Sequence, residues 1–101
     1  MANHVIDISV NNLTGDFYYS PSTVRVPDPG LDTVQWQCSV PFALMFREGT
    51  PIDHMEIYGG GGPTPMFTVV GSAKGHYHYA VAVFDGTRVF IDSGCPDIIV
   101  N

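Results

Sequence analysis

The chain has 101 residues, and its 10 acidic and 4 basic side chains give a formal net charge of −6 with histidine neutral. Hydrophobic residues make up 45% of the chain and charged residues 14%, which excludes a disordered chain because enough apolar material is present for a core. We expect one domain, 1–101. The scattered basic residues form no patch for a run of phosphates, so we expect no nucleic-acid partner.

The sequence carries no segment of the kind that enters a membrane. No apolar stretch approaches the roughly 18 residues that span a bilayer, and residues 1–4 carry no basic, apolar leader. We therefore expect a cytoplasmic protein with no membrane partner. Cys38 and Cys95 lie far apart and outside metal or redox spacings. In a reducing compartment both would be free thiols, and a disulfide between them is the alternative.

In the first half of the chain, apolar residues alternate with the period of a β-strand and show no helical period. Strands are predicted at 4–11, 17–19, 22–26 and 33–38. In the last of these, Val34, Trp36 and Cys38 face inward, and Trp36 is predicted to anchor the core. The apolar run 41–46 is too short for a helix and predicts a further strand, which is either buried on both faces or a sheet-crossing edge.

The segment 47–65 differs in composition and predicts a long loop. It contains four successive glycines at 59–62, which offer no side chains for packing and predict a segment that is either mobile or passes close to another backbone. No phosphate-loop or dinucleotide-binding spacing accompanies these glycines.

Strands follow at 67–70, 75–84 and 87–92, and Asp85-Gly86 predicts a hairpin between the last two. The segment 96–101 is predicted as an edge strand that could pair with another chain. Strands at this spacing predict an all-β fold, a two-sheet Greek-key antiparallel sandwich of about seven strands, immunoglobulin-like or related. In such a sandwich Tyr77 would tie its hydroxyl to the backbone at a corner.

Three motifs in this order resemble the cupredoxin family. Residues 17–26 are similar to its aromatic-x-Pro strand, Gly30-Leu31-Asp32-Thr33-Val34-Gln35-Trp36 to its Gly-Asp-x-Val-x-Trp strand, and Gly75-His76-Tyr77-His78-Tyr79 to its Gly-x-Tyr-x-Tyr/Phe strand. The resemblance covers residues 17–46 and 65–84 and implies a cupredoxin-like Greek-key sandwich.

Type 1 copper requires two histidines and a cysteine thiolate. The resemblance places Phe42 where the family has its first histidine and Val81 where it has its cysteine, and no His or Met follows Val81. It therefore implies a domain that lacks the copper ligands, with apolar side chains in their place and no cofactor.

One pair of histidines offers an alternative metal site. His76 and His78 lie two apart on a predicted strand, so both imidazoles project from one face, with Cα atoms about 6–7 Å apart. A divalent Cu, Zn or Ni ion would need a third ligand, from His54, His4 or one of two acidic residues, Asp53 and Glu56. The competing interpretation is two exposed histidines without a metal.

No catalytic constellation accompanies these residues, since no serine lies in a nucleophile elbow, and we predict no enzymatic activity. The aspartates at 32, 85, 92 and 97 lack calcium-loop spacing and indicate turn hydrogen bonding. The leading prediction is a metal-free binding or assembly module, homo-oligomeric or with a protein partner. Its predicted contact residues are exposed side chains of two strands, namely His76, His78, Phe84 and Tyr18.

Overall fold

The computed structural model describes residues 2–93 and 96–101. In these residues it contains nine strands and no helix: β1 (Asn3–Val10), β2 (Phe17–Ser20), β3 (Thr23–Val26), β4 (Thr33–Phe46), β5 (Glu56–Pro63), β6 (Phe67–Thr68), β7 (Gly75–Phe84), β8 (Val89–Asp92) and β9 (Asp97–Val100). The all-β prediction is confirmed. Over this described part, no helix with the length and apolar character to cross a membrane is found.

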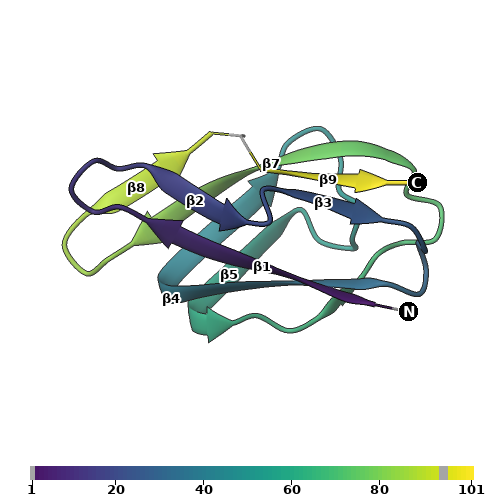
Figure 1. Cartoon of the computed structure of the whole chain (residues 1–101), viewed down its shortest axis with the longest axis horizontal. Coiled ribbons are helices and arrows are strands. Elements are labelled where there is room, and N and C mark those ends of the chain that lie inside the picture. Colours follow the sequence, from purple (N-terminus) through teal and green to yellow (C-terminus); the bar gives the residue numbers. More distant parts are fainter. Residues whose placement is uncertain (1, 94–95) are drawn as a thin grey trace.

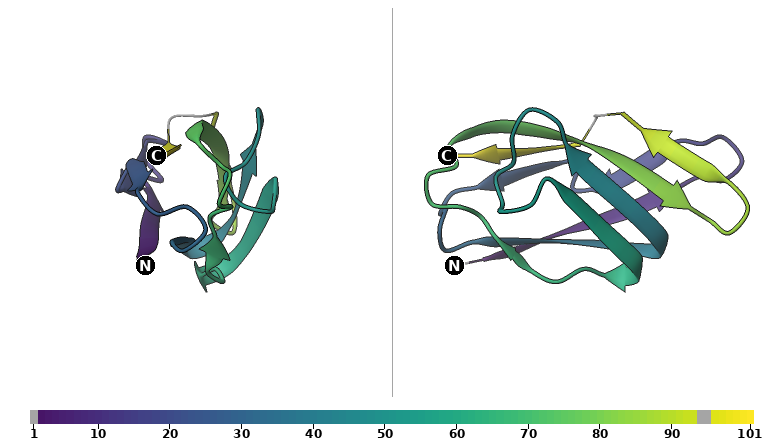
Figure 2. Two further views of the ribbon diagram at one scale, coloured as in Figure 1. Left: turned by 90° about the vertical axis from the view of Figure 1, so that its right-hand side faces the viewer. Right: turned by 180° about the vertical axis from the view of Figure 1, so that it is seen from behind.

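The strands form two facing layers that curl into each other (Figure 1). Viewed end on, β1, β2 and β3 lie in one layer, and most of β4, β5 and β7 in the other (Figure 2). The hydrogen-bonded path runs β2-β1-β4-β7-β9-β3, with β5 and β6 added to β4 and β8 added to β7. This sandwich agrees with the predicted architecture, with nine strands in place of about seven.

Long strands join the two layers. β4 combines the strands predicted at 33–38 and 41–46 into 14 residues, and its register with β5 shifts between Cys38 and Pro41. Such an irregularity bends a strand, so the first half of β4 pairs with β1 and the second half pairs with β7. The β1–β4 and β3–β9 pairs are parallel, so the sandwich is mixed where a purely antiparallel one was expected.

The core fills the space between the layers and follows the predicted alternation. Val34, Trp36 and Cys38 face inward, and Trp36 is completely buried. Its ring meets those of Phe46 and Tyr79 edge-on or tilted, with centroids 6.3 and 5.8 Å away, an arrangement that aromatic pairs favour.

The N-terminal strand is fixed to the rest of the sandwich by a buried carboxylate. Asp32 is completely buried, and it accepts a hydrogen bond from the Ala2 amide at 2.9 Å. The His4 ring contacts its other oxygen at 3.0 Å. Because both partners flank Asn3, the first residue of β1, and Asp32 directly precedes β4, the Asp32 side chain fixes where β1 begins beside β4.

The predicted loop at 47–65 is shorter than expected. Residues 56–63 form β5, which pairs antiparallel with β4 along most of its length. The glycines are accommodated because Gly61 and Gly62 adopt positive φ angles, and because Gly59 lies under the ring of Phe42. Of the two predicted alternatives for the glycine run, the close approach to another backbone is therefore the one that the structure shows.

The C-terminal segment also differs from its prediction. β9 lies between β7 and β3 and pairs with both, so it is an inner strand and not an edge. Ile98 and Val100 are buried. Because both edges of β9 are already hydrogen-bonded, β9 cannot recruit another chain. The Asp85-Gly86 hairpin is confirmed, since β7 and β8 pair from Phe84 and Val89 onward.

Candidate metal site

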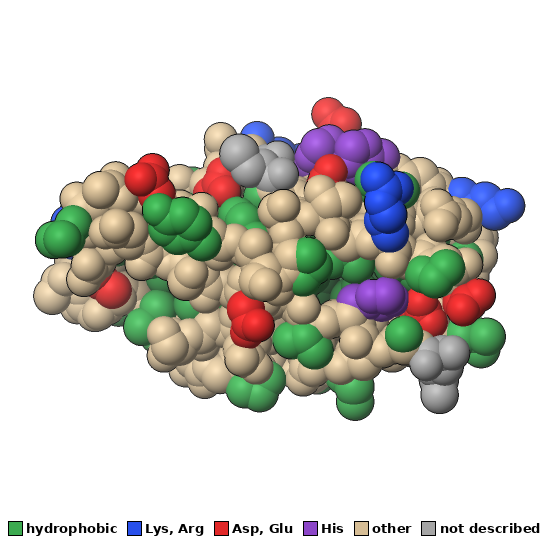
Figure 3. All heavy atoms as spheres, viewed as in Figure 1, with side chains coloured by type: hydrophobic (Ala, Val, Ile, Leu, Met, Phe, Trp, Pro, Cys, Tyr) green, Lys and Arg blue, Asp and Glu red, His purple; other side chains and the backbone are tan. Residues whose placement is uncertain are grey.

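β7 carries the two histidines of the candidate site on its outer face. Tyr79, Val81 and Val83 point into the core, so His76 and His78 project to the outside, as the alternation predicted. In the space-filling view, histidine side chains form a continuous patch along the edge where β7 and β9 run (Figure 3). The strand pairing brings a carboxylate to this patch, because Asp97 on β9 is the Cα partner of His78.

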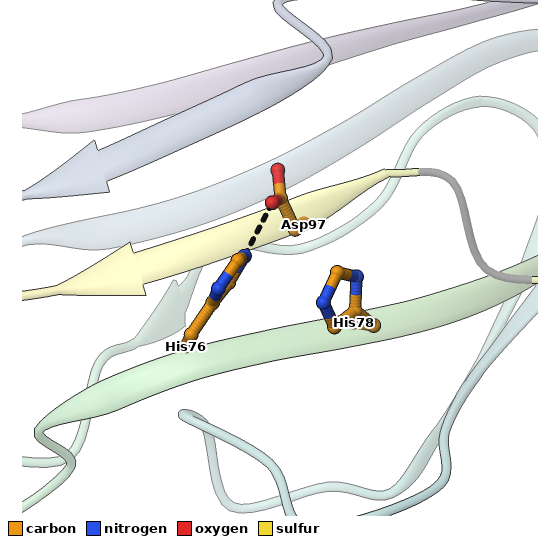
Figure 4. Close-up of side chains that lie close together, drawn as sticks. All are labelled: His76, His78 and Asp97. Carbon is orange, nitrogen blue, oxygen red and sulfur yellow. Dashed lines mark hydrogen bonds and ion pairs between the residues drawn. The ribbon is translucent and has the colours of Figure 1, made fainter.

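The three side chains converge on one point (Figure 4). The Nε2 atom of His76 contacts Oδ2 of Asp97, and the two imidazole rings lie with centroids 4.5 Å apart. One ligand atom from each of the three residues lies within 4.8 Å of the others. Donor atoms around a tetrahedral zinc ion lie about 3.3 Å apart, so the three ligand atoms would have to approach one another by up to about 1.5 Å to bind one ion.

The carboxylate of Asp97 is largely buried and is ionised at neutral pH. Its side chain is 13% exposed and that of His76 is 50% exposed. Burial on its own raises the pKa of Asp97, but the neighbouring Thr23 hydroxyl and His76 outweigh it and lower the pKa below its ordinary value. Its Oδ1 atom is buried and has no hydrogen bond of standard geometry within the described residues.

Two imidazoles and one carboxylate form a borderline-hard donor set. Imidazole nitrogen suits zinc, copper and nickel, and carboxylate oxygen is accepted by all three. Three protein ligands leave at least one coordination position open, which is typical of sites where a metal also meets a small molecule.

The other predicted metal ligands lie elsewhere. His54 is exposed and packs its ring against Phe67, with centroids 5.0 Å apart. His4 contacts Asp32, and Glu56 accepts a hydrogen bond from Tyr58. Among the described residues, neither these three nor Asp53 joins the cluster.

The predicted contact and structural residues are spread over the sandwich. Phe84 lies on the outer face of β7 and is 46% exposed, whereas Tyr18 lies on β2 and is 56% exposed. The structure therefore does not bring Tyr18 together with the histidine pair. Phe42 and Val81 are buried. Tyr77 packs beside the core, and its hydroxyl is 3.5 Å from the Lys74 carbonyl oxygen.

Asp97 was missed as a ligand because it was interpreted as a turn residue. That interpretation suits Asp85, whose side chain accepts the amide hydrogens of Thr87 and Arg88. For Asp97 the informative signal is the alternation of inward-facing and outward-facing side chains along the two strands. In β9, Ile98 and Val100 face inward, so Asp97 faces outward, and antiparallel pairing with β7 then places it beside the histidines.

Comparison with solved structures places this sandwich among known folds. It superposes on a structure titled "Novel Purple Cupredoxin from Nitrosopumilus maritimus" with a TM-score of 0.57 and 24% identity, over 97% of this chain and 99% of that one. A native pseudoazurin from Hyphomicrobium denitrificans matches with a TM-score of 0.50 and 16% identity, over 98% of this chain and 75% of that one. The chain has a cupredoxin-like fold. No family model and no curated protein matches the sequence.

Among the described residues, no group of three possible metal ligands includes a cysteine, which type 1 copper requires. Val81 and Phe42, at the positions that the resemblance assigns to copper ligands, are buried apolar side chains. The buried thiol of Cys38 joins no histidine, and the one cluster of three His, Cys, Asp or Glu ligands in this described part contains no cysteine. The prediction that the chain lacks the copper ligands also concerns Cys95, which lies outside the described residues, so for Cys95 it stays a prediction.

Proposed function

We propose that this cupredoxin-like domain binds a divalent transition metal ion, of the class of Zn²⁺, Cu²⁺ or Ni²⁺, through His76, His78 and Asp97. The convergence of three ligand atoms from β7 and β9 within 4.8 Å supports the proposal. A third donor in place is the reason to prefer metal binding over a metal-free module.

The charge of the site favours a cation for a second reason. The carboxylate of Asp97, whose pKa lies below its ordinary value, carries a negative charge at neutral pH, and the chain as a whole carries a net charge of −6. A metal dication bound between neutral imidazoles and this carboxylate replaces a hydrogen bond to one imidazole with coordination to all three groups.

Calorimetric titration of the protein with Zn²⁺ tests this function. One ion should bind per chain. The variant His78→Ala should weaken the affinity for Zn²⁺ at least about tenfold, because it removes one of the three ligands. His54→Ala is the matched control, since it deletes an exposed histidine outside the cluster, and its affinity should equal that of the unaltered protein. No saturable binding, or equal affinities in all three proteins, would refute the proposal.

A second candidate function is self-assembly through the outer face of the sheet. Tyr58, Ala43, Ala82 and Ile91 lie side by side in register across β5, β4, β7 and β8. Met45 and Phe84 extend this row, and Tyr58 and Ile91 are 75% and 71% exposed. We call this surface the alanine face, because small residues form its floor and large apolar residues its rim.

The occupant that we propose for the alanine face is a second copy of the chain. Two copies that each carry a charge of −6 repel one another, and they approach most easily where charge is lowest. Two charged residues of opposite sign, Glu56 and Arg47, lie beside the row, and Glu56 accepts a hydrogen bond from the Tyr58 hydroxyl. Exposed apolar side chains grouped around small ones are typical of interaction surfaces.

A further inference from the structure

A cavity of about 350 Å³ lies beside the candidate metal site. Its walls are formed by β7 residues, including both histidines, by the turn Arg47–Gly49 and by Ser93. Ligand pockets in proteins begin at about 300 Å³, so the cavity is large enough for a molecule of a few heavy atoms.

The topology of β7 explains why the cavity opens there. β4 ends at Phe46, whose Cα partner is Tyr79, so the segment of β7 that bears the histidines has no strand on that edge. The turn after β4 runs alongside instead, and a Cβ atom at Gly49 would lie 3.7 Å from the ring of Tyr77. β9 covers the opposite edge and carries Asp97.

The histidine pair therefore lies between an acid and a base. Asp97 flanks it on the β9 edge, and Arg47 flanks it on the open edge, inside the cavity. Both imidazoles line the cavity, and Asp97 does not. A small molecule in the cavity would therefore meet a metal ion held by these residues at the imidazole side of the site.

The charges around those positions favour an anion. A divalent ion with neutral imidazoles and one carboxylate keeps one net positive charge. Arg47 adds a second positive charge and Glu48, which also lines the cavity, removes one. A net positive charge remains, and a guanidinium forms a charge-assisted hydrogen bond with a carboxylate oxygen.

We infer that the site binds a small carboxylate molecule, with one oxygen on the metal ion and the other paired with Arg47. Ser93 lines the same cavity and offers a hydroxyl donor. This inference rests on the proposed metal site, and it adds the class of small molecule that the metal would meet there.

Acetate binding to the Cu²⁺-loaded protein tests the inference, followed by the electron paramagnetic resonance spectrum, which reports a change of copper ligand. The spectrum should shift saturably with acetate and should not shift with acetamide, its neutral counterpart. Arg47→Met should weaken acetate binding at least about tenfold, because it removes a charge-assisted hydrogen bond. Glu48→Gln should tighten it by relieving repulsion.

Arg88→Met is the control for the loss of a basic side chain. Arg88 donates to the Asn12 carbonyl and stacks on Phe90 near the other end of β7, so its loss should leave acetate affinity unchanged. If copper binds but acetate has no saturable effect, or if Arg47→Met binds acetate as well as the unaltered protein, the inference is wrong while the metal site stands. If copper itself does not bind, the proposed function fails first.

Discussion

The ring of Phe42 covers the backbone of Gly59 so closely that a Cβ atom at position 59 would lie 2.1 Å from Cε1 of Phe42. Gly59→Ala must therefore push the buried ring aside, and we expect a loss of about 1–3 kcal/mol in the free energy of unfolding. Urea denaturation measures it. Gly60→Ala is the control, since a Cβ there meets nothing within 4 Å. Equal stability of the two variants would contradict this packing.

Asp32 should stabilise the fold at neutral pH and should lose this effect in acid. The hydrogen bond from His4 is the main cause that lowers the pKa of Asp32 below its ordinary value of 3.8, and the Ala2 amide adds to it. A lowered folded-state pKa means that the unfolded chain binds more protons in that range. The stabilisation is therefore present above pH 3.8 and is lost as the pH falls from there through the lower folded-state value.

The variant Asp32→Asn tests this acid dependence. It should unfold more easily at neutral pH, and its free energy of unfolding should change less between neutral and acidic pH than that of the unaltered protein. Asp53→Asn, an exposed position, should leave both quantities as they are. Parallel pH profiles for Asp32→Asn and the unaltered protein would show that the buried carboxylate has no such role.

The alanine face predicts self-association that a single charge abolishes. Ala82→Asp places a carboxylate in the middle of the row between Ala43 and Ile91, where a second copy would have to desolvate it. Sedimentation velocity should detect oligomers of the unaltered protein and of Ser72→Asp, which adds the same charge at an exposed loop position. Ala82→Asp should sediment as a monomer. If the unaltered protein stays strictly monomeric at high concentration, the proposal of self-association through the alanine face is wrong.

Local pattern predicted much of this fold, and pairing between distant strands decided the rest. The alternation in β7 placed Tyr79 and Val81 inside and both histidines outside, because side-chain parity is a local property. β5 escaped prediction because glycine has low strand propensity, and its pairing depends on Phe42, 17 residues earlier in the chain.

The third ligand shows the same limit at the site. Asp97 meets His76 only because β9 is inserted between β7 and β3, and residues 21 positions apart become neighbours. Sequence spacing revealed two donors on one strand. The donor on the second strand required the register of that pairing.

Copper provides a separate test of the positions occupied by Phe42 and Val81. With two imidazoles and a carboxylate as ligands, Cu²⁺ bound to the reduced protein should give only weak visible absorption, because an intense band requires a thiolate ligand. Visible spectroscopy during a Cu²⁺ titration measures this. An intense band would contradict the assignment of apolar residues to the copper-ligand positions.

The most direct test of the metal site is the melting temperature of the protein as Zn²⁺ is added, compared with that of the double variant His76→Ala/His78→Ala. A ligand that binds the native state stabilises it by mass action, so the melting temperature of the unaltered protein and of His54→Ala should rise saturably. At a free concentration of about a hundred times Kd, the rise should be on the order of 10 °C. The double variant should show no rise. A melting temperature that does not respond to Zn²⁺, or that rises equally in the double variant, would contradict a metal site at His76, His78 and Asp97.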